Sequence, residues 1–177
     1  SPTWMLGRRL RGKALGIVGM GRIGTAVANR ARSFGLNIHY FSRHRRPPQI
    51  EEALGATYWE SLDDMVGEVD IVSLHTPLSR STHHILNADR LRRMRQDAFV
   101  VNVSRPELVE EAALIAEIES GHLSGATLDV FESRNGIDPR LLQLARDNRV
   151  VLTAHMASAT LEARLEMGET VIVNIRA

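Results

Sequence analysis

The sequence predicts an α/β fold, a doubly wound parallel sheet of the Rossmann type. One observation is a short apolar run at 14–18 that breaks into glycines spaced G-x-G-x-x-G and then resumes at helical spacing. A second is that short apolar runs alternate with amphipathic stretches along the chain, which favours parallel strands connected by helices. A third is that polar residues follow several expected strands, where ligands bind in such sheets.

Apolar periodicity and helix start and stop signals locate the individual elements. We expect strands at 14–18, 36–41, 56–58, 70–74, 98–102, 125–130 and 149–153. We expect helices after the glycines and at 50–54, 62–66, 87–95, 110–120, 139–146 and 160–176. Ser61 suits an N-cap, and Pro139 suits a first helical turn. The chain is expected to be a single dinucleotide-binding domain, 1–177, that ends inside a helical pattern, as an excised or truncated domain does.

Composition restricts the classes of partner. The net charge is +1 over 177 residues, which gives no general case for nucleic acid or an anionic membrane. Cysteine is absent, and the adjacent pair His83-His84 shows no metal-ligand spacing, so we expect no metal site. No apolar run is long enough for a membrane span, and no signal-peptide pattern is present. A cytoplasmic protein is expected.

The glycine-rich turn predicts a dinucleotide site. Gly19 allows a tight turn, Gly21 lets the backbone approach a pyrophosphate, and Gly24 lets the helix pack closely on the strand. A glycine-rich turn with a purely structural role is the alternative, but the strand before it and the helical pattern after it favour nucleotide binding.

The end of the second strand indicates which dinucleotide is bound. NAD sites usually have an acidic residue here, whereas this chain has Ser42 followed by Arg43, His44, Arg45 and Arg46. A hydroxyl beside guanidinium groups can bind a ribose 2′-phosphate. We therefore expect NADP as the preferred cofactor and NAD as the second. A solvated basic loop closed by Pro47-Pro48 is the alternative interpretation.

Five motifs closely resemble the cofactor domain of the D-specific 2-hydroxyacid dehydrogenases. They are GIVGMGRIG at 16–24, LHTPL at 74–78, VNVSR at 101–105, LDVFE at 128–132 and LTAHMASAT at 152–160. The likeness covers nearly the whole chain, and the Ser-Arg ending of the second strand is most similar to the glyoxylate/hydroxypyruvate reductase branch. Members of this family carry a second, discontinuous substrate domain that is absent here.

The resemblance implies roles for individual residues. Arg105 is expected to bind the carboxylate of a small 2-oxo acid, and His155 to act as general acid during hydride transfer. Asp129 would bind the nicotinamide carboxamide. The remaining expected contacts are Val103 and Ser104 at the nicotinamide ribose, Thr76 and Pro77 at the adenosine half, and the amides of Arg22 and Ile23 at the pyrophosphate.

Departures from the family pattern leave a second hypothesis open. The family's glutamate that partners the histidine falls on Arg134, and Pro106 replaces the glycine after the substrate arginine. The alternative to a reductase is therefore a catalytically impaired nucleotide-binding or regulatory relative, with Glu132 or Asp138 as substitute acids if activity is retained. A homodimer is expected, with the apolar patch Trp4-Met5-Leu6 at its interface.

Overall fold

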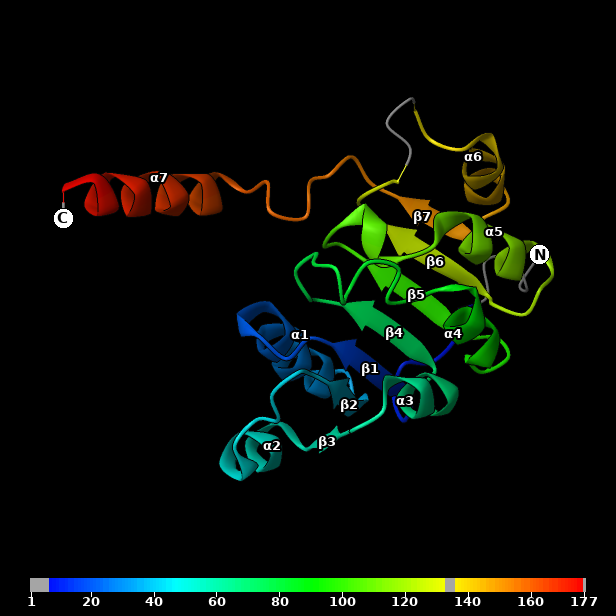
Figure 1. Cartoon of the computed structure of the whole chain (residues 1–177), viewed down its shortest axis with the longest axis horizontal. Coiled ribbons are helices and arrows are strands. Elements are labelled where there is room, and N and C mark those ends of the chain that lie inside the picture. Colours follow the sequence, from blue (N-terminus) through cyan, green and yellow to red (C-terminus); the bar gives the residue numbers. More distant parts are fainter. Residues whose placement is uncertain (1–6, 133–135, 177) are drawn as a thin grey trace.

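The computed structural model describes residues 7–132 and 136–176, and its body is a seven-stranded parallel sheet with flanking helices (Figure 1). The strand order is β3-β2-β1-β4-β5-β6-β7. β1 and β4 are neighbours, and Val18 pairs with Leu74 at their carboxyl ends. Because the order runs outward in both directions from this pair, the sheet is doubly wound with its switch point between β1 and β4.

The elements follow one another in strict alternation over most of the chain. The strands are β1 (Ala14–Val18), β2 (Asn37–Phe41), β3 (Ala56–Tyr58), β4 (Ile71–Leu74), β5 (Phe99–Asn102), β6 (Gly125–Leu128) and β7 (Val150–Leu152). The helices are α1 (Arg22–Ser33), α2 (Pro48–Leu54), α3 (Leu62–Glu68), α4 (Ala88–Arg93), η1 (Pro106–Leu108), α5 (Glu111–Glu119), α6 (Pro139–Arg146) and α7 (Leu161–Arg176).

Two clusters of buried side chains lie on opposite faces of the sheet. Ile17 and Val18 are consecutive in β1 and therefore point to opposite faces, the first into a cluster under α1 and α2, the second into a larger cluster under α3, α4, α5 and α6. Right-handed crossovers in the two directions of the sheet produce this division. The α1 side of β5–β7 belongs to neither cluster, and Val151 there is 59% exposed.

The expected strands and helices are confirmed, with corrections at their ends. α2 begins earlier than expected, at Pro48, because proline is accommodated in a first helical turn. α4 ends at Arg93 and not at residue 95, because Met94 adopts an extended ψ of 152°. The strand expected at 125–130 ends at Leu128, and the short helix η1 was not foreseen. Ser61 is the expected N-cap and accepts a hydrogen bond from the amide of Asp64.

α7 lies away from the sheet, at the end of an extended segment (Figure 1). Its apolar side chains face solvent, with Leu161 71% and Ile175 78% exposed. Within the described residues, no helix combines the length and apolarity that a membrane crossing requires. The apolar patch Trp4-Met5-Leu6, on which the dimer expectation depends, lies outside the residues that the structure describes.

The packing predicts opposite effects for two glycine-to-alanine changes. In Gly125→Ala the new Cβ would lie 1.9 Å from the carbonyl oxygen of Arg149, so we expect a loss of stability of about 1–3 kcal/mol or more. Gly67→Ala in α3 is the matched control, because its Cβ would meet only the Arg93 carbonyl at 3.6 Å. That change should stabilise the helix by roughly 0.5–1 kcal/mol. Urea unfolding of both variants tests this, and equal midpoints would contradict it.

Candidate active site

The glycine-rich turn joins the carboxyl end of β1 to α1. Gly19 has φ +100°, and a Cβ there would lie 2.7 Å from the carbonyl oxygen of His75. At Gly24 a Cβ would lie 2.1 Å from the Gly19 carbonyl oxygen, whereas at Gly21 it would meet nothing within 4 Å. The turn is therefore closed at its first and third glycines and open at its second. The open position precedes the first amides of α1, those of Arg22 and Ile23, which have no partner within the helix.

A cavity of about 560 Å³ lies beside this turn, between the ends of β2 and β4. It brings together four of the expected cofactor residues with the glycines: Ser42, Arg43, Thr76 and Pro77. Residues that the sequence analysis did not select also line it, namely His44, His75, Ser79, Ser81 and Thr82. The available signal was proximity to a strand end, since His75 follows β4 directly and His44 follows β2 closely, whereas the other three lie further along their loop. The cavity is the natural candidate for the adenosine half of a dinucleotide.

Arg45 lies in a separate network and does not line this cavity. Its Nε and Nη2 each donate to a carboxylate oxygen of Glu51 at 2.9 Å, and its guanidinium lies over the ring of Tyr58. The Tyr40 hydroxyl donates to the same carboxylate at 2.6 Å and accepts the amide of Arg46. Of the two arginines expected to bind the cofactor, Arg43 lines the cavity and Arg45 pairs with Glu51 outside it. A contact between Arg45 and the cofactor stays a prediction.

His75 adds an uncharged polar group to the wall of the cavity. Its Nε2 lies 2.8 Å from the hydroxyl of Ser73, and its buried Nδ1 has no partner among the described residues. Burial lowers the pKa of His75, which favours the neutral ring. The ring therefore places no positive charge in the wall of the cavity.

The turn after β5 carries Arg105 and is fixed by a buried amide. The Nδ2 of Asn102 donates to the Arg105 carbonyl at 2.8 Å, and its Oδ1 accepts the amide of Ser104 at 3.1 Å. The Ser104 hydroxyl donates to the carbonyl of Leu74 at 2.7 Å, which ties this turn to β4. Arg105 has φ −136° and ψ 139°, the extended conformation that the following Pro106 imposes. Its guanidinium is exposed, donates to the Ser104 carbonyl at 2.8 Å and lines neither cavity of this edge.

Asp129 holds the segment that follows β7. It is 1% exposed, and its carboxylate accepts hydrogen bonds from the Thr153 hydroxyl, the Met156 amide at 2.9 Å and the Ala157 amide at 3.0 Å. Burial alone would raise the pKa of Asp129, but these hydrogen bonds outweigh burial and lower it. The side chain expected to bind a carboxamide therefore already has three donors within the protein.

His155 lies in the loop that Asp129 clamps. Its amide donates to the Asp129 carbonyl at 3.1 Å, and its φ of +51° is in the left-handed region. His155 and Pro106 line one cavity of about 480 Å³ together with Asp129, Phe131 and Ile137. The segment after β5 and the segment after β7 therefore meet at one cavity on the carboxyl edge of the sheet.

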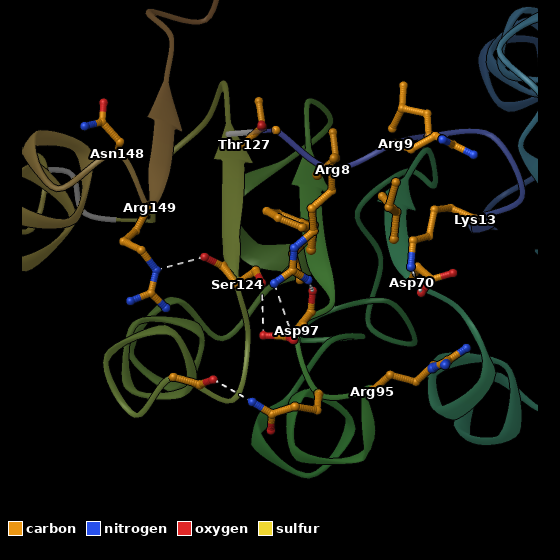
Figure 2. A pocket seen from close by; sticks show the side chains of 18 residues that line it. Arg8, Arg9, Lys13, Asp70, Arg95, Asp97, Ser124, Thr127, Asn148 and Arg149 are labelled. Atoms are coloured by element: carbon orange, nitrogen blue, oxygen red, sulfur yellow. Dashed lines mark hydrogen bonds and ion pairs between the residues drawn. The ribbon is translucent and has the colours of Figure 1, made fainter. Parts of the chain in front are cut away.

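A larger cavity, about 880 Å³, lies at the other end of the sheet, beside the amino ends of the strands (Figure 2). Its charges largely satisfy one another. Arg8 pairs with Asp97 at 3.4 Å and Lys13 with Asp70 at 3.3 Å, while the Arg149 guanidinium donates to three backbone carbonyls. These groups serve the fold, and none of the expected site residues reaches this cavity.

Comparison with known proteins agrees with this geometry. Residues 1–157 match the model of the D-isomer specific 2-hydroxyacid dehydrogenase, NAD binding domain. The chain belongs to this family. The glyoxylate reductase of Thermococcus kodakarensis is 44% identical over 98% of this chain and 51% of its own length.

Solved structures show the same relationship. A D-isomer specific 2-hydroxyacid dehydrogenase from Polaromonas has a TM-score of 0.92 at 44% identity, over 100% of this chain and 54% of that one. A glyoxylate reductase from Paecilomyes thermophila has a TM-score of 0.89 at 40% identity, over 97% of this chain and 50% of that one. The chain thus spans about half the length of the relatives that it matches.

In this member of the family, both acids suggested as substitutes for the histidine's partner are bonded elsewhere. Glu132 lies 2.7 Å from Nε2 of His84, and Asp138 caps α6 and pairs with Arg140 at 2.9 Å. In the described part of the chain, the His155 ring has no carboxylate partner. Arg134, which occupies the family's glutamate position, lies outside the described residues.

The Asp129 clamp predicts a stability defect in Asp129→Asn. In either orientation of the new side chain, its amide nitrogen would face a backbone N–H that a carboxylate oxygen now accepts. We therefore expect the free energy of unfolding to fall by about 1–3 kcal/mol. Because folding lowers the pKa of Asp129, its stabilisation is complete above the unfolded value of 3.8 and is lost as pH falls below it. Urea unfolding at neutral pH and at about pH 3, below that unfolded value, measures this. If the free energies of unfolding of wild type and variant differ by the same amount at both pH values, the role of the charge is contradicted.

Proposed function

We propose that the protein containing this chain reduces small 2-oxo acids of the glyoxylate or hydroxypyruvate type, with NADP(H) preferred over NAD(H). The observation that carries the proposal is the meeting of Pro106, the residue after Arg105, with His155 at one cavity, on the same edge as the glycine-rich turn. Relatives that are glyoxylate reductases support the substrate class.

The residues present fit a nicotinamide dinucleotide. The open space at Gly21 admits a pyrophosphate against the start of α1, and the cavity beside Ser42 and Arg43 admits an adenosine. Thr76 and Pro77 would line the adenosine side, and Val103 and Ser104 the nicotinamide ribose. When bound, the reduced cofactor supplies the hydride for the substrate carbon.

The chain's own residues would then bind and orient the oxo acid. Arg105 offers two parallel N–H groups to the substrate carboxylate, and Pro106 restrains its backbone so that less ordering is needed on binding. His155 gives a proton to the keto oxygen as general acid. Asp129 acts as a positioning residue, because it holds the backbone on either side of His155.

The catalytically impaired relative is the second candidate. It is favoured because, in the described residues, no carboxylate forms a hydrogen bond or ion pair with the His155 ring, as the family's glutamate is expected to do. Cofactor binding does not depend on that acid, since the glycine-rich turn and the cavity between β2 and β4 are intact. A homodimer remains part of the proposal for either candidate.

Cofactor choice gives the first test of the proposal. We expect NADPH to bind this chain roughly tenfold to a hundredfold more tightly than NADH, because charge-assisted contacts are worth about 1.5–3 kcal/mol. Ser42→Asp should reverse the preference by repelling the 2′-phosphate. Arg43→Ala should reduce NADPH affinity more than Arg45→Ala, the matched control, because Glu51 holds Arg45 outside the cavity. Calorimetric titration that finds equal dissociation constants for NADPH and NADH would contradict the preference.

Turnover of the full-length protein tests the reaction. We expect oxidation of NADPH with glyoxylate or hydroxypyruvate, and His155→Ala should lower kcat by roughly 10²- to 10⁴-fold without weakening NADPH binding. Arg105→Ala should instead raise KM for the oxo acid. Arg105→Lys should raise KM less than Arg105→Ala but still above the wild-type value, since lysine lacks the paired donors. Steady-state kinetics on both substrates separate the effects. Intact NADPH binding without turnover would favour the impaired relative.

A further inference from the structure

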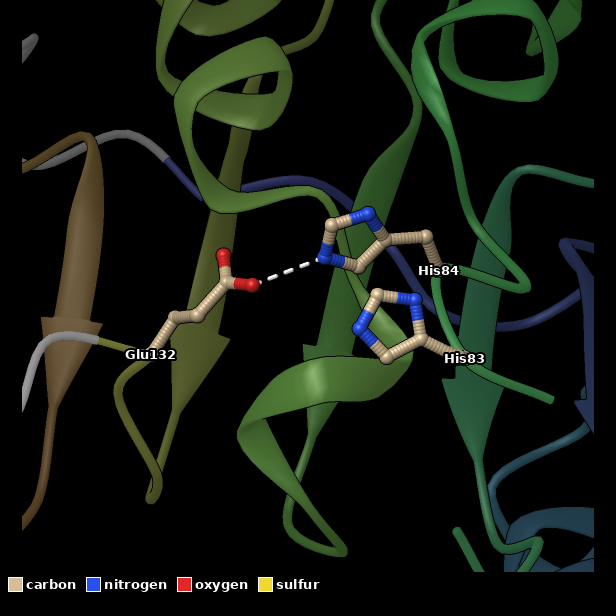
Figure 3. A group of neighbouring side chains, drawn as sticks. All are labelled: His83, His84 and Glu132. Atoms are coloured by element: carbon tan, nitrogen blue, oxygen red, sulfur yellow. Dashed lines mark hydrogen bonds and ion pairs between the residues drawn. The ribbon is translucent and has the colours of Figure 1, made fainter. Parts of the chain in front are cut away.

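The fold brings together His83, His84 and Glu132, which lie outside both cavities of the carboxyl edge (Figure 3). The two histidines are in the loop between β4 and α4, and Glu132 follows β6. Consecutive residues of an extended segment point to opposite sides, but His84 has φ +47°. This left-handed conformation turns both imidazoles to one side, where their ring centroids are 4.0 Å apart.

The donor atoms of the three side chains converge. One ring nitrogen from each histidine and one Glu132 oxygen all lie within 4.8 Å of one another, and Nε2 of His84 is 2.7 Å from Oε1 of Glu132. Two neighbouring ligands of a tetrahedral cation with bonds of about 2.1 Å are roughly 3.4 Å apart. Small side-chain rotations therefore suffice to place all three donors around one ion.

Glu132 is held in place by a reciprocal pair of hydrogen bonds. Its Oε2 accepts the backbone amide of Glu111 at 3.3 Å, while a Glu111 carboxylate oxygen accepts the amide of Glu132 at 3.0 Å. Oε1 is thus the oxygen that faces the histidines. Hydrogen bonds of this kind, from outside the ligand set, orient metal-binding carboxylates.

We propose that His83, His84 and Glu132 form a binding site for a divalent transition-metal cation of the Zn²⁺ type. Two imidazoles and one carboxylate are a donor set that suits Zn²⁺, Co²⁺ and Ni²⁺, and water completes the coordination because all three side chains reach solvent. Adjacent histidines have no usual metal-ligand spacing, but the left-handed His84 brings both rings to one side.

A cation here would connect two loops of the nucleotide site. Thr82, next to His83, lines the cavity between β2 and β4, and Phe131, next to Glu132, lines the cavity of His155. His83 distinguishes a metal site from a simple His84–Glu132 ion pair, because the ion pair forms without any contribution from the His83 ring. The ring of His83 makes no hydrogen bond in the described part of the chain, so removing it should leave folding intact.

A titration with Co²⁺ alone tests the proposal. We expect saturable visible absorption bands at one Co²⁺ per chain, displaced by Zn²⁺, and a higher melting temperature in the presence of Zn²⁺. His83→Ala and Glu132→Gln should each weaken Co²⁺ binding by roughly tenfold or more. His122→Ala is the matched control, since His122 lies beside Gln96 at the amino edge, and it should bind as wild type does.

Two results would overturn the site. One is the lack of saturable Co²⁺ absorption by the wild-type chain. The other is binding by His83→Ala that equals wild type, which would leave His84 and Glu132 as an ion pair only. Because none of these readouts involves oxo acid turnover, the outcome is independent of the proposed reductase activity.

Discussion

The close approach of Gly19 to the end of β4 is the constraint on which the rest of the structure depends. Any side chain at Gly19 would collide with the His75 carbonyl, so β1 and β4 can be parallel neighbours up to their last residues only with glycine here. This pairing creates the switch point and aims the start of α1 at it. Because all seven strands are parallel, the segments that carry Ser42, Arg105 and His155 then reach the same edge.

Asp129 positions the loop that carries His155. A buried carboxylate is tolerated only when hydrogen bonds compensate its lost hydration, and the donors from Thr153, Met156 and Ala157 provide this. Those same bonds fix both sides of His155 in a left-handed conformation that the backbone would otherwise disfavour. The same hydrogen bonds therefore stabilise the buried Asp129 carboxylate and hold His155 in place.

Apolar periodicity made the fold predictable from the sequence, and the positions of the strand ends indicated which residues lie at the carboxyl edge of the sheet. Each strand has a local apolar pattern, and the residue after a parallel strand must lie on the ligand side, so Thr76 and Arg105 could be located without coordinates. Pairings between distant side chains have no such local signal. The Asn102 amide bridge, the Asp129 bonds and the left-handed His84 all depend on how segments far apart in the chain meet.

The basic loop after β2 shows why like residues in a motif contribute differently. Hydrogen bonds from Arg45 and Tyr40 lower the pKa of Glu51 to about 2, while burial and the bond to Glu51 raise the pKa of Tyr40 to about 12. The network therefore keeps its charges over the neutral range, and the Tyr40 hydroxyl holds the Arg46 amide. Arg45 is held in this network, which fixes the loop and leaves Arg43, two residues earlier, at the cavity. In the proposed NADP(H) complex, Arg45 would therefore act on the nucleotide only through the conformation of the loop, whereas Arg43 would face it from the wall of the cavity.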